Sequence, residues 1–257
     1  MSLSTQANFT RISGEDIIGN ISIKDVMLED EHGRHDVGDI EIASHMGDEL
    51  TRVRLHSAFA EGSYVGNKFL ASFIRDIQNV STLKELPSLY KSGQANWDNN
   101  RYELSFLFHN TKDVLSFFAP GAYIADSTAL SMKITADGQM KANVKSGRIA
   151  LKDKYLKGIK LSADNASGKL GGVMTVGELS AGPIKTMANK LSFNADADSL
   201  SVDFSYDNKT ELENRGGVHL GGNIFGDEID TLRAKFRFFA SHILLNGAKW
   251  DISSSDI

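Results

Sequence analysis

A period-two alternation of apolar and polar residues recurs along most of this 257-residue chain. Segment 200–206 (LSVDFSY) carries an apolar residue at every even position, and segment 232–238 (LRAKFRF) repeats the pattern. Successive side chains of a β-strand point to opposite faces, so this alternation predicts strands with one apolar and one polar face. Turn residues separate the segments at short intervals, and the sequence therefore predicts a long antiparallel meander that is mainly β.

Composition narrows the class of protein. The chain is 41% hydrophobic and 24% charged, as folded domains are, and its three prolines suit regular strand pairing. A net charge of −5 gives no overall basic field for nucleic acid. The absence of cysteine excludes disulfides, thiolate nucleophiles and cysteine-bound zinc. Met1-Ser2-Leu3 reads as a cloning scar, so we expect an internal piece of a longer protein.

Two interruptions of the alternation predict two short helices. Segment 67–90 has apolar residues at three-to-four spacing and predicts a helical insert that Pro87 ends. Segment 111–119 predicts a second helix, with Thr111 as its cap, Asp113 in its first turn and the following Pro-Gly pair as its end. We therefore expect one β-rich unit over residues 1–257, which carries both helices.

Local signals predict turns, bulges and edges. Asp137-Gly138 predicts a tight hairpin turn, and the glycine pairs 171–172, 216–217 and 221–222 predict β-bulges. Free strand edges are expected near Ile21 and near residues 242–245. The apolar face has three ways to be covered: a second sheet, curling of the sheet on itself, or a roof made by the two helices. Curling would leave an open, taco-like groove.

No constellation of reactive residues stands out. Segment 30–36 holds Asp30, Glu31, His32, His35 and Asp36, which a metal could use, but a polar hairpin turn is the preferred interpretation. Segment 196–198 (DAD) lacks the glycine and distal glutamate of a calcium loop and is interpreted as a turn. The two tryptophans, at positions 97 and 250, are interpreted as packing anchors. We expect a protein that is not an enzyme and needs no cofactor.

Several segments resemble one protein family. They are 21–28 (ISIKDVML) with 38–42 (GDIEI), 106–108 (FLF), 114–125 (VLSFFAPGAYIA), 130–132 (LSM) and 244–252 (LLNGAKWDI). Together they are similar to the TamB-like translocation and assembly module proteins, in the form found in Bacteroidetes. The resemblance spans most of the chain.

The resemblance implies a function in the cell envelope. Members are long proteins related to AsmA-like and other bridge-type lipid carriers. An N-terminal helix anchors them in the inner membrane, and a curled sheet with an apolar trough crosses the periplasm. They are associated with outer-membrane protein assembly and with phospholipid transport toward the outer membrane. The resemblance implies that this chain is a periplasmic segment of such a protein.

On this interpretation the inward residues of the meander line a groove for phospholipid acyl chains. The expected lining is Leu130, Met132, Ile134, Met140, Val144, Ile159, Leu161, Leu191, Phe193, Leu200, Val202, Phe204, Leu220, Leu232, Ala234, Phe236 and Phe238. Contacts with an outer-membrane assembly protein would lie outside this chain. The alternative is a scaffold with a dry, packed core that assists outer-membrane protein assembly. Close packing of the inward face would favour the scaffold.

Overall fold

The protein is mainly β, with its strands in one sheet. The computed structural model describes residues 2–13, 16–31, 33–47, 49–68, 70, 73, 100–208, 214–226, 232–245 and 247–256. The strands are β1 (Ser2–Ser13), β2 (Asp16–Asp30), β3 (Gly33–Met46), β4 (Thr51–Ser57), β5 (Ala60–Gly66), β6 (Tyr102–Phe108), β7 (Ala122–Ile124), β8 (Thr128–Ile134), β9 (Met140–Leu151), β10 (Lys154–Asp164), β11 (Leu170–Ala181), β12 (Ile184–Asp196), β13 (Ser199–Asp207), β14 (Arg215–Gly226), β15 (Leu232–Phe238), β16 (Ser241–Leu245), β17 (Ala248–Ile252) and β18 (Ser255–Asp256). Within the described residues one helix can be followed from end to end, α2 (Lys112–Phe118), and Leu70 and Phe73 are also helical.

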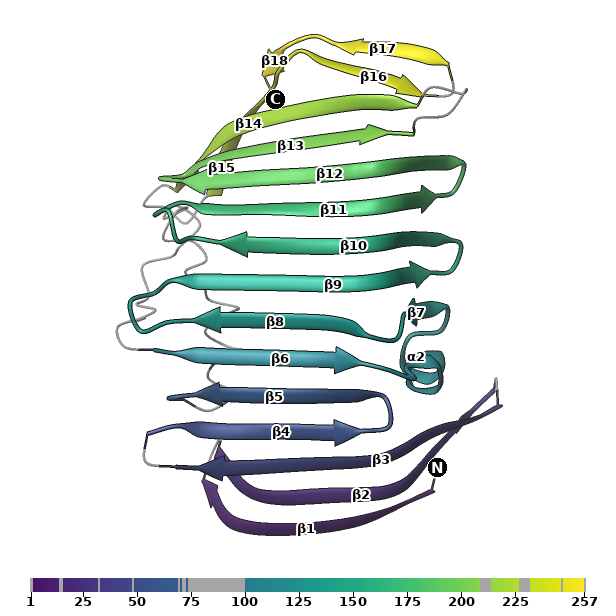
Figure 1. Ribbon diagram of the computed structural model, residues 1–257, viewed down its shortest axis with the longest axis vertical. Helices are drawn as coiled ribbons and strands as arrows, with labels where there is room; N and C mark the ends of the chain where they lie inside the picture. Colours follow the sequence, from purple (N-terminus) through teal and green to yellow (C-terminus); the bar gives the residue numbers. More distant parts are fainter. Residues whose placement is uncertain are drawn as a thin grey trace.

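The predicted antiparallel meander is confirmed. Strands β1 to β6 pair in chain order, β6 pairs with β8, and pairing then runs in order from β8 to β14. The short β7 pairs with the end of β9. Figure 1 shows the strands stacked along the long axis, with β1 near one end and β17 at the other. The sheet is open, because within the described residues β1 pairs only with β2 and β17 only with β16.

Strand β14 divides its outer edge between two partners. Residues Leu220 to Gly226 pair with β15, whereas Arg215 to Gly217 pair with β16. Strand β15 also pairs with β18, and β16 pairs with β17. The edge residues differ from those that the sequence predicted. Ile21 pairs on both sides, with β1 and β3, and β16 lies between β14 and β17.

The hairpin turn at Asp137-Gly138 is confirmed. The Gly138 amide donates to the Thr135 carbonyl over 2.8 Å, and Gly138 has a φ of +81°, which glycine adopts without steric cost. The turn between β12 and β13 also forms as predicted, with Ala197 and Asp198 at positive φ.

The predicted bulges at 171–172 and 221–222 are wrong, because the registers of β11 and β14 with their neighbours show no shift there. Beside the pair 216–217, the register along the outer edge of β14 changes by one residue, since Leu220 pairs with Phe238 of β15 but Gly217 pairs with His242 of β16. A Cβ added to Gly172 would lie 2.5 Å from the ring of Phe193 on the next strand. A Cβ at Gly222 would lie 2.5 Å from the ring of Phe236 and also too close to the backbone of β15. These glycines therefore allow an aromatic ring to lie across the neighbouring strand.

Two clusters cover parts of one sheet face. Phe73, which is helical, packs on Tyr64 and Tyr102, with 4.9 Å between the centroids of the Phe73 and Tyr102 rings. Helix α2 packs through Phe117 on a cluster centred on Val26 in β2 and its neighbours in β3. Most of the predicted insert 67–90 lies outside the described residues, of which Leu70 and Phe73 are helical.

The predicted helix 111–119 is confirmed as α2, but its cap differs. The Thr111 hydroxyl donates to the Ile124 carbonyl over 3.0 Å and makes no capping hydrogen bond. Asp113 lies in the first turn as predicted, and the helix ends at Phe118, before Pro120. Within the described residues, no helix is both long and apolar enough to cross a membrane.

Candidate functional site

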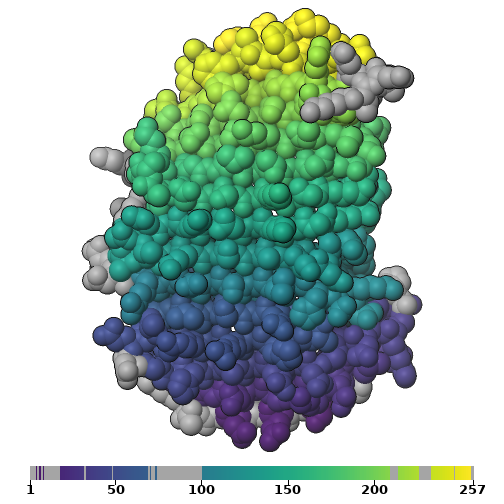
Figure 2. Space-filling view, viewed as in Figure 1, coloured from purple at the N-terminus to yellow at the C-terminus, as the bar shows by residue number. Residues whose placement is uncertain are grey.

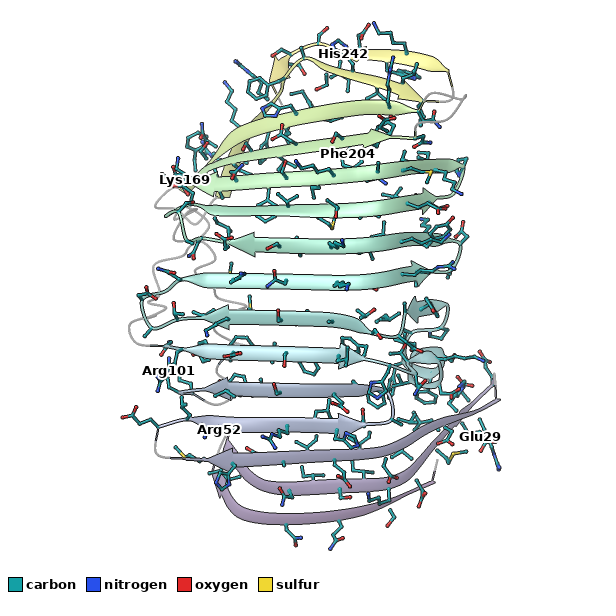
Figure 3. All side chains as sticks on the ribbon, viewed as in Figure 1. Glu29, Arg52, Arg101, Lys169, Phe204 and His242 are labelled. Carbon is teal, nitrogen blue, oxygen red and sulfur yellow. The ribbon has the colours of Figure 1, made fainter. Side chains whose placement is uncertain are left out.

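The strand registers bring the predicted lining residues onto one face of the sheet. One cross-strand row, which we call the apolar row, continues through directly paired residues of every main strand from β2 to β14. Its members are Ile21, Ile42, Leu55, Gly62, Phe106, Leu130, Val144, Leu161, Met174, Leu191, Phe204 and Val218. Phe204 lies near the middle of β13, whereas Arg101 and Lys169 lie at strand ends (Figure 3). The row therefore runs along the long axis, across the strands.

The other predicted lining residues flank the apolar row on the same face. The neighbouring row contains Met132, Phe193, Val202, Leu220 and Phe238. Further along the same strands lie Ile134, Met140, Leu200, Ala234 and Phe236, while Ile159 lies on the opposite side of the row. Ile134 and Ile159 are buried and Ala234 is exposed; the side chain of Leu232 lies outside the described residues, and the others are partly exposed.

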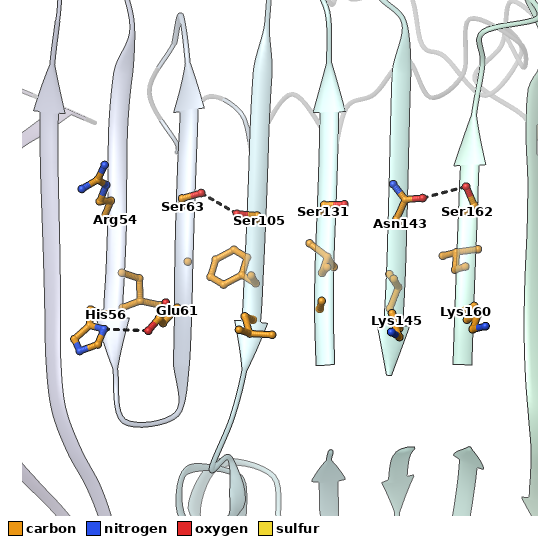
Figure 4. A pocket seen from close by; sticks show the side chains of 18 of the residues that line it. Arg54, His56, Glu61, Ser63, Ser105, Ser131, Asn143, Lys145, Lys160 and Ser162 are labelled. Atoms are coloured by element: carbon orange, nitrogen blue, oxygen red, sulfur yellow. Dashed lines mark hydrogen bonds and ion pairs between the residues drawn. The ribbon is translucent and has the colours of Figure 1, made fainter. Parts of the chain in front are cut away.

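The opposite face, which the alternation marks as polar, carries an open groove of about 990 Å³. Two cross-strand rows of side chains form its walls. One wall is Arg54, Ser63, Ser105, Ser131, Asn143, Ser162 and Val173, and the other is His56, Glu61, Leu107, Ala129, Lys145, Lys160 and Thr175. The backbone of the apolar row lies between these walls and forms the floor, since its side chains point to the other face. We call this site the polar groove (Figure 4).

Hydrogen bonds link neighbouring strands along the polar groove. Ser63 and Ser105 hydroxyls lie 2.8 Å apart, and Ser162 donates to the Asn143 side-chain oxygen over 3.1 Å. In the other wall, Leu107 is an apolar residue, and it is 43% exposed. Figure 2 shows the surface coloured in chain order along the long axis, from the N-terminal part at one end to the C-terminal part at the other.

A charged cluster occupies one end of strands β10 to β12. The Glu178 carboxylate, 16% exposed, accepts from Lys185 over 2.8 Å, from Tyr155 over 2.5 Å and from Lys157 over 3.2 Å. These donors, Lys185 first, lower the pKa of Glu178 from its ordinary value of 4.5 to about 2. The Arg148 guanidinium lies 4.7 Å from the centre of the Tyr155 ring. The arrangement favours the charged form of the carboxylate.

The metal interpretation of segment 30–36 gains no support. His35 is buried, and its Nε2 lies 3.0 Å from the Asp30 carboxylate. The centroids of the His35 and Phe117 rings are 5.9 Å apart, in a T-shaped arrangement. Among the described residues no three histidine or acidic side chains gather as a metal site, and His32 lies outside them. Position 97 also lies outside the described residues. Trp250 is 63% exposed, so its interpretation as a packing anchor is wrong.

The sequence marked the polar groove residues only as the exposed face of strands. Serine or asparagine recurs at the polar positions of β5, β6, β8, β9 and β10, but these positions are far apart in the chain. Which of them stand opposite one another depends on register, which the alternation leaves open.

Comparisons of the chain with protein-family models, with curated proteins and with solved structures found no match.

Proposed function

We propose that this protein binds phospholipid acyl chains along the apolar row and works without catalysis. The observation that carries the proposal is the continuity of the row across β2 to β14. Between β8 and β14 every member of the row is partly exposed. Neighbouring strands lie about 4.8 Å apart, so the row extends over roughly 50 Å. An acyl chain that follows it would run across the strands, along the long axis of the molecule.

The physical basis is the burial of apolar surface. A fully buried leucine or phenylalanine contributes about 1.5–3 kcal/mol, and the partly exposed members of the row retain a fraction of that. A bound acyl chain would bury the remainder without requiring directional contacts. The affinity would then depend little on the lipid headgroup, because the row contains no charged residue.

The resemblance of several segments to TamB-like proteins is what supports a biological setting for this proposal. We propose a periplasmic segment of a longer protein that is tethered to the inner membrane and serves lipid transport and outer-membrane assembly. The open meander is compatible with that setting. The dry scaffold is the second candidate, and the clusters under Phe73 and Phe117 favour it, because there the apolar face is packed by helical residues.

The test is binding of a fluorescent fatty acid to the purified chain. Leu161 belongs to the apolar row, and its neighbour Ser162 faces the polar groove, so the two positions form a matched pair. Leu161→Gln should weaken binding about fivefold or more, which corresponds to about 1 kcal/mol of lost apolar contact. Ser162→Gln should change the affinity less than twofold.

Circular dichroism and thermal melts identify variants that fail to fold. Leu191→Gln, on another strand of the same row, serves as a second variant if Leu161→Gln is unstable. A folded wild-type chain that takes up no fatty acid would favour the dry scaffold. Equal losses from Leu161→Gln and Ser162→Gln would contradict the assignment of acyl chains to the apolar face.

A further inference from the structure

Two lysines stand directly opposite each other in one wall of the polar groove. Lys145 of β9 pairs with Lys160 of β10, and Figure 4 shows them side by side. Neither makes a hydrogen bond or ion pair with any residue that the structure describes. Their neighbours in the same row are Ala129 and Thr175, which carry no charge. Like charges directly opposite in a sheet are destabilising, so this pair lacks the compensation that a folded sheet normally provides.

A second lysine pair, between β8 and β9, shows how neighbouring carboxylates can offset the repulsion between two lysines. Lys133 stands opposite Lys141, on the same face as Lys145. That row continues to Glu103 on one side and to Asp164 on the other, and Lys133 lies 3.8 Å from the Glu103 carboxylate. Lys145 and Lys160 have no such acidic neighbours in their row. They therefore concentrate positive charge inside a groove, although the chain is acidic overall.

The facing wall supplies hydrogen-bonding groups. Ser131, Asn143 and Ser162 are paired across β8, β9 and β10, beside the two lysines. Ser162 donates to the Asn143 oxygen, which orients the amide and leaves its NH₂ group free of any described acceptor. Two ammonium groups match the charge of a phosphate monoester, about −1.5 to −2, and the amide offers a further donor for its three terminal oxygens.

We propose that Lys145, Lys160 and Asn143 bind a phosphate monoester in the polar groove. The rest of an elongated ligand would extend along the groove, over Ala129 and the exposed side chain of Leu107. The phosphate belongs either to a lipid headgroup, as in phosphatidic acid, or to a small soluble molecule. The site lies on the face opposite the apolar row, so this inference does not depend on acyl-chain binding.

The test is an NMR titration of the isotope-labelled chain with glycerol 3-phosphate at constant ionic strength. We expect saturable shifts at the amides of Asn143, Lys145 and Lys160. Lys160→Gln should weaken binding at least tenfold. Lys141→Gln removes the same charge from the same face of β9 and should change the affinity less than twofold, because Asp164 and Glu103 already compensate its row.

Stability of the free chain is an independent readout. Lys160→Gln removes a like-charge contact, so its melting temperature without ligand should equal or exceed that of the wild type, while the increase caused by glycerol 3-phosphate should disappear. Flotation with phosphatidylcholine vesicles that contain phosphatidic acid distinguishes the two sources. Vesicle capture that Lys160→Gln abolishes assigns a lipid headgroup, whereas binding of glycerol 3-phosphate alone assigns a soluble monoester.

Two results would overturn the proposal. One is the absence of saturable shifts at these amides with glycerol 3-phosphate and of vesicle capture by the wild type. The other is equal weakening by Lys141→Gln and Lys160→Gln, since that would show a general effect of positive charge on this face. Screening by salt is common to both lysines, which is why the titration is run at constant ionic strength.

Discussion

Three donors hold the Glu178 carboxylate in its charged form and lower its pKa to about 2. Its carboxylate, on β11, accepts hydrogen bonds from Lys185 of β12 and from Tyr155 and Lys157 of β10. The same contact raises the pKa of Lys185. These residues meet because the registers of β10, β11 and β12 carry them to one end of the sheet. Strand pairing thus determines which charged side chains surround Glu178 and, through them, its pKa.

The lowered pKa of Glu178 makes stability depend on acid pH. A carboxyl group whose pKa is lower in the folded than in the unfolded state stabilises the fold above pH 4.5, and this stabilisation is lost as the pH falls toward about 2. Glu178→Gln should therefore flatten the decline in the free energy of unfolding between pH 4.5 and 2, as measured by urea denaturation. Tyr155→Phe, which removes one donor of three, should flatten it only in part. Identical pH profiles for Glu178→Gln and wild type would show that these contacts do not stabilise the charged carboxylate.

At the scale of elements, helix α2 shows how one short helix covers a sheet. Its consecutive residues Phe117 and Phe118 have opposite environments. Phe117 packs with the cluster of Val26 and its neighbours, whereas Phe118 is 70% exposed. Seven residues are too few for an isolated helix to be stable in water, so tertiary packing must hold α2 in place.

The two phenylalanines provide a matched test of that packing. Phe117→Ala should lower the free energy of unfolding by about 1–3 kcal/mol, because it removes a partly buried ring and its contact with His35. Phe118→Ala should change it by less than about 0.5 kcal/mol, as exposed positions do. Urea denaturation followed by circular dichroism measures both. A larger loss for Phe118→Ala would mean that the helix is rotated relative to the sheet.

At the scale of the whole molecule, the open sheet has two ends. Strand β1 forms one edge, and at the other end β17 and β18 each have a single partner strand in the described part of the chain. Open edges present backbone groups that can pair with another chain. Trp250 on β17 adds exposed apolar surface at such an edge. These features favour self-association of the separate chain.

If the chain self-associates through its strand edges, a charged substitution should reduce association only when it lies on an edge strand. Trp250→Lys should reduce concentration-dependent self-association, measured by sedimentation velocity, because a charge on an edge strand opposes strand addition. Leu151→Lys is the control: Leu151 is also exposed, but it ends β9, which has partners on both sides. Equal effects of the two changes would indicate association through general hydrophobicity. A wild-type chain that stays monomeric would show that its edges are protected.

Much of the fold follows from the sequence by itself. The alternation in segment 200–206 predicts both that β13 is a strand and which face Phe204 occupies, and the structure agrees. The turn at Asp137-Gly138 and helix α2 were predicted because their signals lie within a few neighbouring residues. The cap of α2 was not, since the Thr111 hydroxyl bonds to Ile124, a partner that only the folded chain brings close.

Register was decided by the tertiary structure alone. A one-residue slip of a strand would exchange its two faces, so alternation determines the facing of each side chain. A two-residue slip keeps the facing and replaces every cross-strand neighbour, and local sequence does not distinguish the two registers. For this reason the sequence predicted an apolar face, but not that Lys145 stands opposite Lys160 or that the walls of the polar groove align. Those placements depend on pair contacts summed over whole strands, which exist only once the sheet has formed.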